Sequence, residues 1–153
     1  MQDMVATRSR TPMHLWIVGG IGTLWNAFGC YDYLMTRTQG AEYIASMMPG
    51  ADADAVMAYI NSFPVWASFG WGLGVWGGLL GSVMLLLRSR WAVPTLGLSF
   101  VGALLGIGYQ LLNPGGPPEM NHGPNAVMPY IILAVALGLF LYARAMRAKG
   151  VLR

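Results

Sequence analysis

The sequence predicts an all-α integral membrane protein, a four-helix bundle with short amphipathic helices in its first outer loop. Only 10% of the 153 residues are charged, against about 25% in soluble domains. The chain also contains four long apolar runs, and its basic residues gather on one side of them. A surface with so few charges could not keep a compact soluble protein dispersed, and the length suits one transmembrane domain over residues 1–153.

The four apolar runs cover residues 15–35, 64–87, 91–112 and 126–146. Each is long enough for a membrane span, because about 20 helical residues cross roughly 30 Å of hydrocarbon. Their interiors hold no Lys, Arg or Glu. Lipid offers no hydrogen bonds to the backbone, so each run should be helical. The alternating polarity of a β-barrel strand is absent.

The basic residues predict the orientation. If all four runs cross, eight bases share one side with both termini: Arg8, Arg10, Arg88, Arg90, Arg144, Arg147, Lys149 and Arg153. Arg37 alone lies on the opposite side, where Glu42, Asp52, Asp54 and Glu119 also fall. Basic residues favour the cytoplasmic side. We therefore expect cytoplasmic termini in a multi-pass protein of the bacterial inner membrane.

The first run has an alternative interpretation as a cleaved secretory or lipoprotein signal. Arg8 and Arg10 precede an apolar stretch that ends at Cys30, which is the general order of such a signal. However, bulky Phe28 stands where a lipoprotein cleavage site has a small residue, and Asn26 interrupts the apolar core. We therefore favour a retained first membrane helix.

The connections predict how the spans are arranged. Residues 88–90 alone join the second and third runs, so these two helices should be antiparallel neighbours. The first outer segment, residues 36–63, is divided by Pro49 and Gly50, a strong breaker, and should form two short amphipathic helices on the membrane surface. Residues 114–125 contain four Pro and three Gly and should form an irregular loop.

Small residues recur at helical spacing in the second and third runs. The positions are Gly70, Gly74, Gly78 and Ser82, with Gly102 and Gly106 in the third run. Such spacing lets two membrane helices approach closely. Packing within one bundle is the favoured interpretation. A groove for the helix of another protein and a hinge for transport are the alternatives.

Three polar residues are candidates for a working site within the spans. Asp32 is the only carboxylate inside a run, and ionisable residues within a span are functional candidates by default. A proton or cation site is possible there, but we favour an interfacial carboxylate that meets water or Arg37. Asn26 and Gln110 are the deepest amides. Such amides usually bond to another helix, and a substrate contact is the alternative.

The motifs of the common enzyme and metal sites are missing. The sequence has one cysteine, no CxxC, and two histidines that the topology puts on opposite sides, so no metal or cofactor is expected. It lacks HExxH, GxSxG and P-loop patterns, and we therefore expect no enzyme. The bases lie at the edges of apolar runs rather than on a polar surface, which argues against nucleic-acid binding.

Three stretches carry a resemblance to a known group. They are WNAFGCYDYLMT, SFPVWASFGWGLGVWGGLLGS and the C-terminal YARAMRAKGVLR. In this combination the chain resembles small four-helix inner-membrane proteins of proteobacteria, some of which carry a sugar-transporter label, over almost its whole length. The resemblance implies the fold and the location, and it gives no residue a catalytic role.

Two functions follow as expectations. The first is a non-catalytic accessory or interaction subunit, surrounded by membrane lipids, that packs against other membrane subunits or against a second copy. The alternative is a transporter of a small solute, such as a sugar, or a proton-coupled carrier that works as an oligomer. The transporter would need Asp32 or Asn26 in a water-filled cavity.

Overall fold

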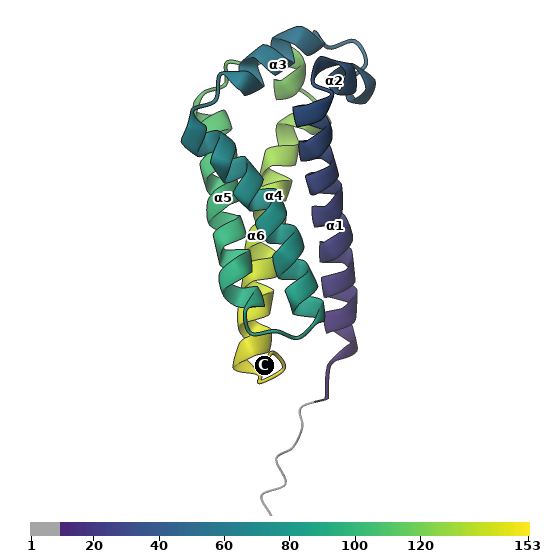
Figure 1. Cartoon of the computed structure of the whole chain (residues 1–153), viewed down its shortest axis with the longest axis vertical. Coiled ribbons are helices and arrows are strands. Elements are labelled where there is room, and N and C mark those ends of the chain that lie inside the picture. Colours follow the sequence, from purple (N-terminus) through teal and green to yellow (C-terminus); the bar gives the residue numbers. More distant parts are fainter. Residues whose placement is uncertain (1–9) are drawn as a thin grey trace, which may run out of the picture.

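The protein is described by a computed structural model that covers residues 10–153. Within that range it is all-helical and contains no strand, which confirms the predicted class. The elements are α1 (Met13–Thr38), α2 (Ala41–Met47), α3 (Ala53–Asn61), α4 (Val65–Leu86), α5 (Ala92–Leu112), the 3-10 helix η1 (Pro118–Asn121) and α6 (Pro124–Ala148). The four long helices run side by side, and α2 and α3 lie across one end of them (Figure 1).

Three of the described helices, α4, α5 and α6, are long and apolar enough to cross a membrane, which is consistent with a membrane protein. The helix α1 is longer, with 26 residues, but it is not in this group. Its sequence includes Thr23, Asn26 and Asp32, and these polar residues lower its mean hydropathy. Length and apolarity alone therefore leave the role of α1 open.

The helices agree closely with the predicted runs. They start and end within three residues of the expected bounds, the largest differences being at the ends of α1, which begins at Met13 and ends at Thr38. The first outer segment forms two short helices, α2 and α3, on either side of Pro49 and Gly50. The second outer segment is mostly irregular, as expected, with one turn of 3-10 helix.

The tightest contact in the bundle joins α4 and α5 and depends on glycine. A Cβ atom added at Gly102 would lie 2.7 Å from both the carbonyl oxygen of Gly70 and the nitrogen of Gly74. Ser99 Oγ donates a hydrogen bond of 2.6 Å to the Gly74 carbonyl oxygen across the same contact. Close backbone approach of this kind stabilises helix pairs through van der Waals contact.

The described parts of α1 and α6 meet near the end of the bundle that holds Arg10 and the C-terminus. There Leu15 packs with Leu139, Ala143 and Met146 in one buried cluster. A hydrogen bond of 2.5 Å also joins His14 Nδ1 and the hydroxyl oxygen of Tyr142. Farther along, α1 packs on α4 and α6 packs on α5, so the opposite ends of α1 and α6 are separated.

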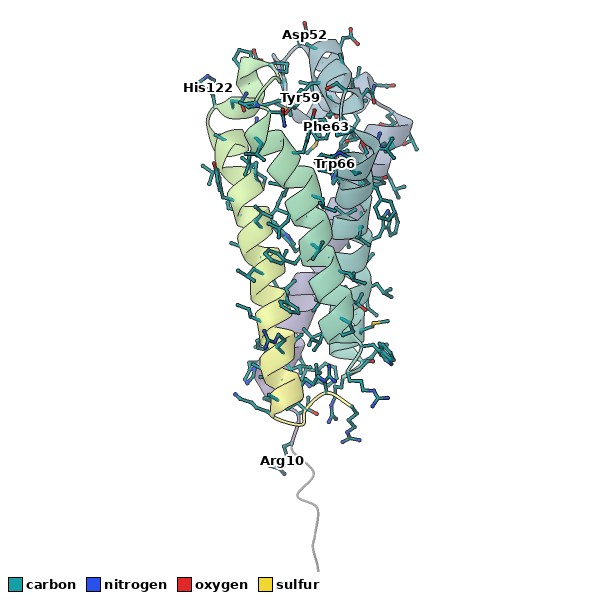
Figure 2. All side chains as sticks on the ribbon, turned by 90° about the vertical axis from the view of Figure 1, so that its left-hand side faces the viewer. Arg10, Asp52, Tyr59, Phe63, Trp66 and His122 are labelled. Carbon is teal, nitrogen blue, oxygen red and sulfur yellow. The ribbon has the colours of Figure 1, made fainter. Side chains whose placement is uncertain are left out.

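The predicted charge asymmetry is present in three dimensions for the described residues. Arg10, the link between α4 and α5 and the C-terminal end of α6 share one end of the bundle, whereas Asp52 and His122 lie at the other (Figures 1 and 2). Arg8 belongs to the same predicted basic set but lies outside the described residues.

Candidate functional site

The main cavity of the described structure lies between α1 and α6, at the end away from the chain termini. It is open and has a volume of about 440 Å³. The long helices α1 and α6 form its walls, α4 and α5 form its floor, and α2 and α3 cover it. All three polar candidates from the sequence, Asn26, Asp32 and Gln110, line this one cavity.

The cavity forms because small side chains face one another where α1 and α6 separate. The floor is made by Gly74 of α4 with Ser99 and Ala103 of α5, and the walls include Gly29 and Ala136. Large side chains fill the opposite end of the bundle, where Leu15 and Leu85 are fully buried. The small residues therefore leave space between the two helices at the end covered by α2 and α3.

Asp32 stands near the outer end of α1 and is held by a residue of α2. The hydroxyl of Tyr43 donates a hydrogen bond of 2.9 Å to Asp32 Oδ1. Asp32 precedes the end of the helix by six residues, or about 9 Å at 1.5 Å per residue. Its second oxygen, Oδ2, has no hydrogen-bond partner among the described residues and is free to meet a ligand.

The expected pairing of Asp32 with Arg37 is not formed. The Arg37 guanidinium carbon lies 5.6 Å from the centre of the Tyr33 ring and 5.3 Å from that of Trp71. These distances suit a cation–π interaction with each ring. The side chains of positions 32 and 37 leave the helix in different directions. Five residues turn an α-helix by about 140° more than one full turn.

Asn26 acts mainly as a cross-link between α1 and α4. Its Nδ2 donates to the Gly22 carbonyl oxygen at 2.8 Å and to Ser82 Oγ at 3.1 Å. Its Oδ1 faces α4 so closely that a Cβ at Gly78 would collide with it. This is the helix-to-helix bond that was expected for a deep amide, made at the inner edge of the cavity.

Gln110 is the least engaged polar side chain of the site. It makes no hydrogen bond with any described residue, and it lines both the main cavity and a neighbouring hollow of about 230 Å³. The first turn of α6 adds a hydrogen-bond acceptor, the backbone carbonyl of Asn125, to the residues that line the same two cavities. Pro129 has no N–H, so the Asn125 carbonyl loses its usual helical donor four residues on.

The six small residues singled out in the sequence lie in the helix contacts of α4. Gly70, Gly74, Gly102 and Gly106 face one another between α4 and α5. Gly78 lies against Asn26 and Ser99, and Ser82 accepts from Asn26. Within the described chain, this row is therefore filled by neighbouring helices, and only Gly74 also borders the cavity.

Sequence reasoning missed Tyr43, the partner of Asp32. It expected Asp32 to meet water or Arg37, but the chain reverses after α1 through Gly40, whose φ is +57°. This turn returns α2 over the cavity and buries Tyr43. Burial, then the hydrogen bond from Tyr43 to Asp32 and the nearby charge of Asp32, raise the pKa of Tyr43 to about 12.

Fold and site together define an all-helical protein with three helices able to cross a membrane and a cavity that carries one carboxylate. No protein family matches the chain, and neither a curated protein nor a solved structure is similar to it. Among the described residues, no group of three His, Cys, Asp or Glu side chains is placed to hold a metal ion.

Proposed function

We propose that this protein is a four-span membrane protein that binds a small apolar or amphiphilic molecule inside the bilayer. The observation that carries the proposal is the cavity between α1 and α6, which gathers three otherwise scattered polar residues of α1 and α5. Its volume of about 440 Å³ falls within the range of roughly 300–1,000 Å³ that is usual for small-molecule sites.

The outward face of α1 supports its role as the fourth span. Ile17, Ile21, Leu24 and Phe28 are all exposed on this face, which water would disfavour and lipid would accept. The polar side chains of α1 point the other way, toward Ser82 of α4 and Tyr43 of α2. A helix with an apolar outside and a polar inside is typical of a membrane bundle.

The proposed orientation puts the cavity in the outer half of the membrane. The end of the bundle that holds Arg88, Arg90 and Arg147 would be cytoplasmic by the positive-inside rule. The cover formed by α2 and α3 would then lie at the outer surface. In a bacterium this arrangement fits the inner membrane, and the molecule would be reached from the outer leaflet.

The mouth of the cavity supports entry from the lipid phase. Trp25 and Phe28 of α1 and Met128 of α6 line the cavity and are also exposed on the outside of the bundle. The opening therefore lies between α1 and α6 and would face acyl chains. Because most of the lining is apolar, a hydrophobic ligand fits better than a sugar, whose many hydroxyls would need partners.

The lining supports binding rather than chemistry. Among its residues only Asp32 and Tyr43 have ionisable side chains, and they are hydrogen-bonded to each other. A hydrolytic site needs a nucleophile with a separate base and donors for a developing charge. Storage, sensing or transport of the bound molecule requires none of these.

A matched pair of variants on α6 tests the proposal. Ala136 lines the cavity, whereas Ala134 of the same helix is exposed on the outside. We expect the purified protein in lipid nanodiscs to bind neutral N-phenyl-1-naphthylamine saturably, at about one molecule per chain. Ala136→Trp should abolish this binding by filling the cavity, and Ala134→Trp should leave it intact, as measured by equilibrium dialysis against empty nanodiscs.

Equal binding by both variants, or no saturable binding to the wild-type protein, would contradict a cavity site. Circular dichroism and size-exclusion chromatography of the two variants serve as the folding control. Since both carry the same added indole, a general effect of tryptophan on partitioning into the nanodisc cancels between them.

An accessory subunit is the second candidate, because α6 still presents small residues to the outside. Ala134 and Gly138 are exposed one turn apart, and no side chain or backbone atom lies within 4 Å of a Cβ added at Gly138. A helix of another subunit, or of a second copy, could approach closely there. Native mass spectrometry after mild extraction should then show a fixed complex that Gly138→Leu dissociates; migration as a monomer would reject this function.

A further inference from the structure

The carboxylate of Asp32 has no positive counterpart in the cavity. No Lys, Arg or His is among the lining residues, and the Arg37 side chain is engaged with the rings of Tyr33 and Trp71. The one bond that Asp32 makes to a described residue comes from the neutral hydroxyl of Tyr43. Removing a carboxylate from water without a counter-charge is costly, and a ligand that carries the missing charge would offset that cost.

The walls around Asp32 are aromatic and rich in methionine. Trp25 and Phe28 line the cavity, and Met47, Met48, Met120 and Met128 line its outer part. Trp71 is also in the lining, but its ring already contacts the Arg37 guanidinium. Aromatic faces attract cations through the ring quadrupole, most strongly in a desolvated site. Methionine side chains adapt to apolar groups of different shape. Such walls suit a cation that is covered with hydrocarbon rather than a metal ion or a hydrated ammonium.

We propose that the ligand of this cavity is a lipophilic organic cation, such as a substituted ammonium. Its charge lies against Asp32 Oδ2, and its apolar groups lie between α1 and α6 against the aromatic walls. This inference rests on the proposed binding function and specifies its ligand class. Tyr43 is a positioning residue here, because its bond to Oδ1 fixes the carboxylate and leaves Oδ2 without a partner among the described residues.

The single negative charge of Asp32, in a lining without a base, disfavours the other amphiphiles of a membrane. A phospholipid, including one with an amine in its headgroup, would place a phosphate among residues that include no base. A fatty acid would place a second carboxylate near Asp32, and like charges at short distance repel. A neutral molecule could enter, but it would leave the Asp32 charge without compensation.

Two probes of closely matched shape and opposite charge provide the test. Tetraphenylphosphonium is a lipophilic cation, and tetraphenylborate is the corresponding anion. In nanodiscs of zwitterionic lipid, we expect the wild-type protein to bind the phosphonium saturably and the borate only as much as empty nanodiscs do. Asp32→Asn should weaken phosphonium binding by about tenfold or more, because it removes the attraction between the carboxylate and the cation.

Three further variants separate charge at the site from general effects. Glu42→Gln removes an exposed carboxylate of α2 that is outside the cavity and should leave binding unchanged. Asp32→Glu retains the charge and should retain most of the affinity, which shows that position 32 tolerates change. Tyr43→Phe should weaken binding less than Asp32→Asn, since it removes the positioning bond alone.

The outcomes distinguish this inference from the proposed function. If Asp32→Asn binds the phosphonium as well as the wild-type protein, or if the borate binds equally, the cation assignment is overturned. Binding of neutral N-phenyl-1-naphthylamine with its sensitivity to Ala136→Trp would then still support a cavity site. If neither the neutral probe nor the cation binds saturably, both proposals fail.

Discussion

At the scale of single residues, the bond between Tyr43 and Asp32 links the cover of the cavity to its wall. Tyr43 is buried in α2, and its hydroxyl reaches the carboxylate of α1 at 2.9 Å. A hydrogen bond to a charged group contributes about 1.5–3 kcal/mol. This contact therefore helps to hold α2 over the site, together with the apolar cluster that Tyr43 and Ile44 form with Val56 of α3.

The bond predicts a specific loss of stability at high pH. Burial first, and then Asp32, raise the pKa of Tyr43 from its ordinary 10.0 to about 12 in the folded protein. The folded state thus favours the protonated phenol. Its stabilising effect should be complete below the unfolded pKa near 10 and should be lost as the pH rises through the folded pKa near 12.

Two measurements check this expectation. Tyrosinate absorbance should show one titration near pH 12 that Tyr43→Phe removes. The thermal stability of the wild-type protein in detergent should fall over the same range relative to Tyr43→Phe, which cannot ionise at this position. A Tyr43 titration at the ordinary tyrosine pKa would mean that α2 does not bury this side chain.

At the scale of elements, the α4–α5 pair is the part of the bundle that tolerates the least change. Backbone atoms of Gly70, Gly74 and Gly102 occupy the space that side chains would need. The pair forms the floor of the cavity, together with Ser99 and Ala103. Close packing there keeps the floor rigid while α1 and α6 diverge above it.

Two alanine substitutions on α5 test this difference. Gly102→Ala would place a Cβ 2.7 Å from backbone atoms of α4 and should destabilise the protein by about 1–3 kcal/mol through overpacking. Gly108→Ala on the same helix meets nothing within 4 Å and should be neutral or slightly stabilising, because alanine favours helix. Melting temperatures in detergent measure both, and equal effects would reject the close contact.

At the scale of the whole molecule, the number of spans depends on α1. Three helices meet the length and apolarity of a span, and α1 lies beside them with an apolar outer face. If all four cross, residues 10 and 54 lie on opposite sides of the membrane. If α1 lies outside the bilayer, those two residues share a side.

Cysteine labelling separates these two topologies. In a background with Cys30→Ala, Asp54→Cys should react in intact cells with a maleimide that cannot cross the membrane. Arg10→Cys and Ser89→Cys should react only after the membrane is permeabilised. Labelling of both Arg10→Cys and Asp54→Cys in intact cells would contradict four spans, and labelling of Ser89→Cys would contradict cytoplasmic placement of the α4–α5 link.

The sequence by itself determined the helical class, the element bounds and the charge asymmetry. These depend on local properties: the length of an apolar run, the breakers at Pro49 and Gly50, and the place of each base along the chain. It also singled out Asn26, Asp32 and Gln110, because polar groups stand out within apolar runs. The spacing of the glycines likewise indicated a close helix contact without naming the partner helix.

Only the tertiary structure decided that those three residues share a cavity and that Asp32 meets Tyr43 rather than Arg37. The cavity arises because α1 and α6 converge at Leu15 and Leu139 and separate beyond them. That divergence depends on the sizes of side chains on different helices. The return of α2 depends on one backbone angle at Gly40. A single contact between residues of two helices, such as that of Tyr43 with Asp32, leaves no periodic pattern in a sequence.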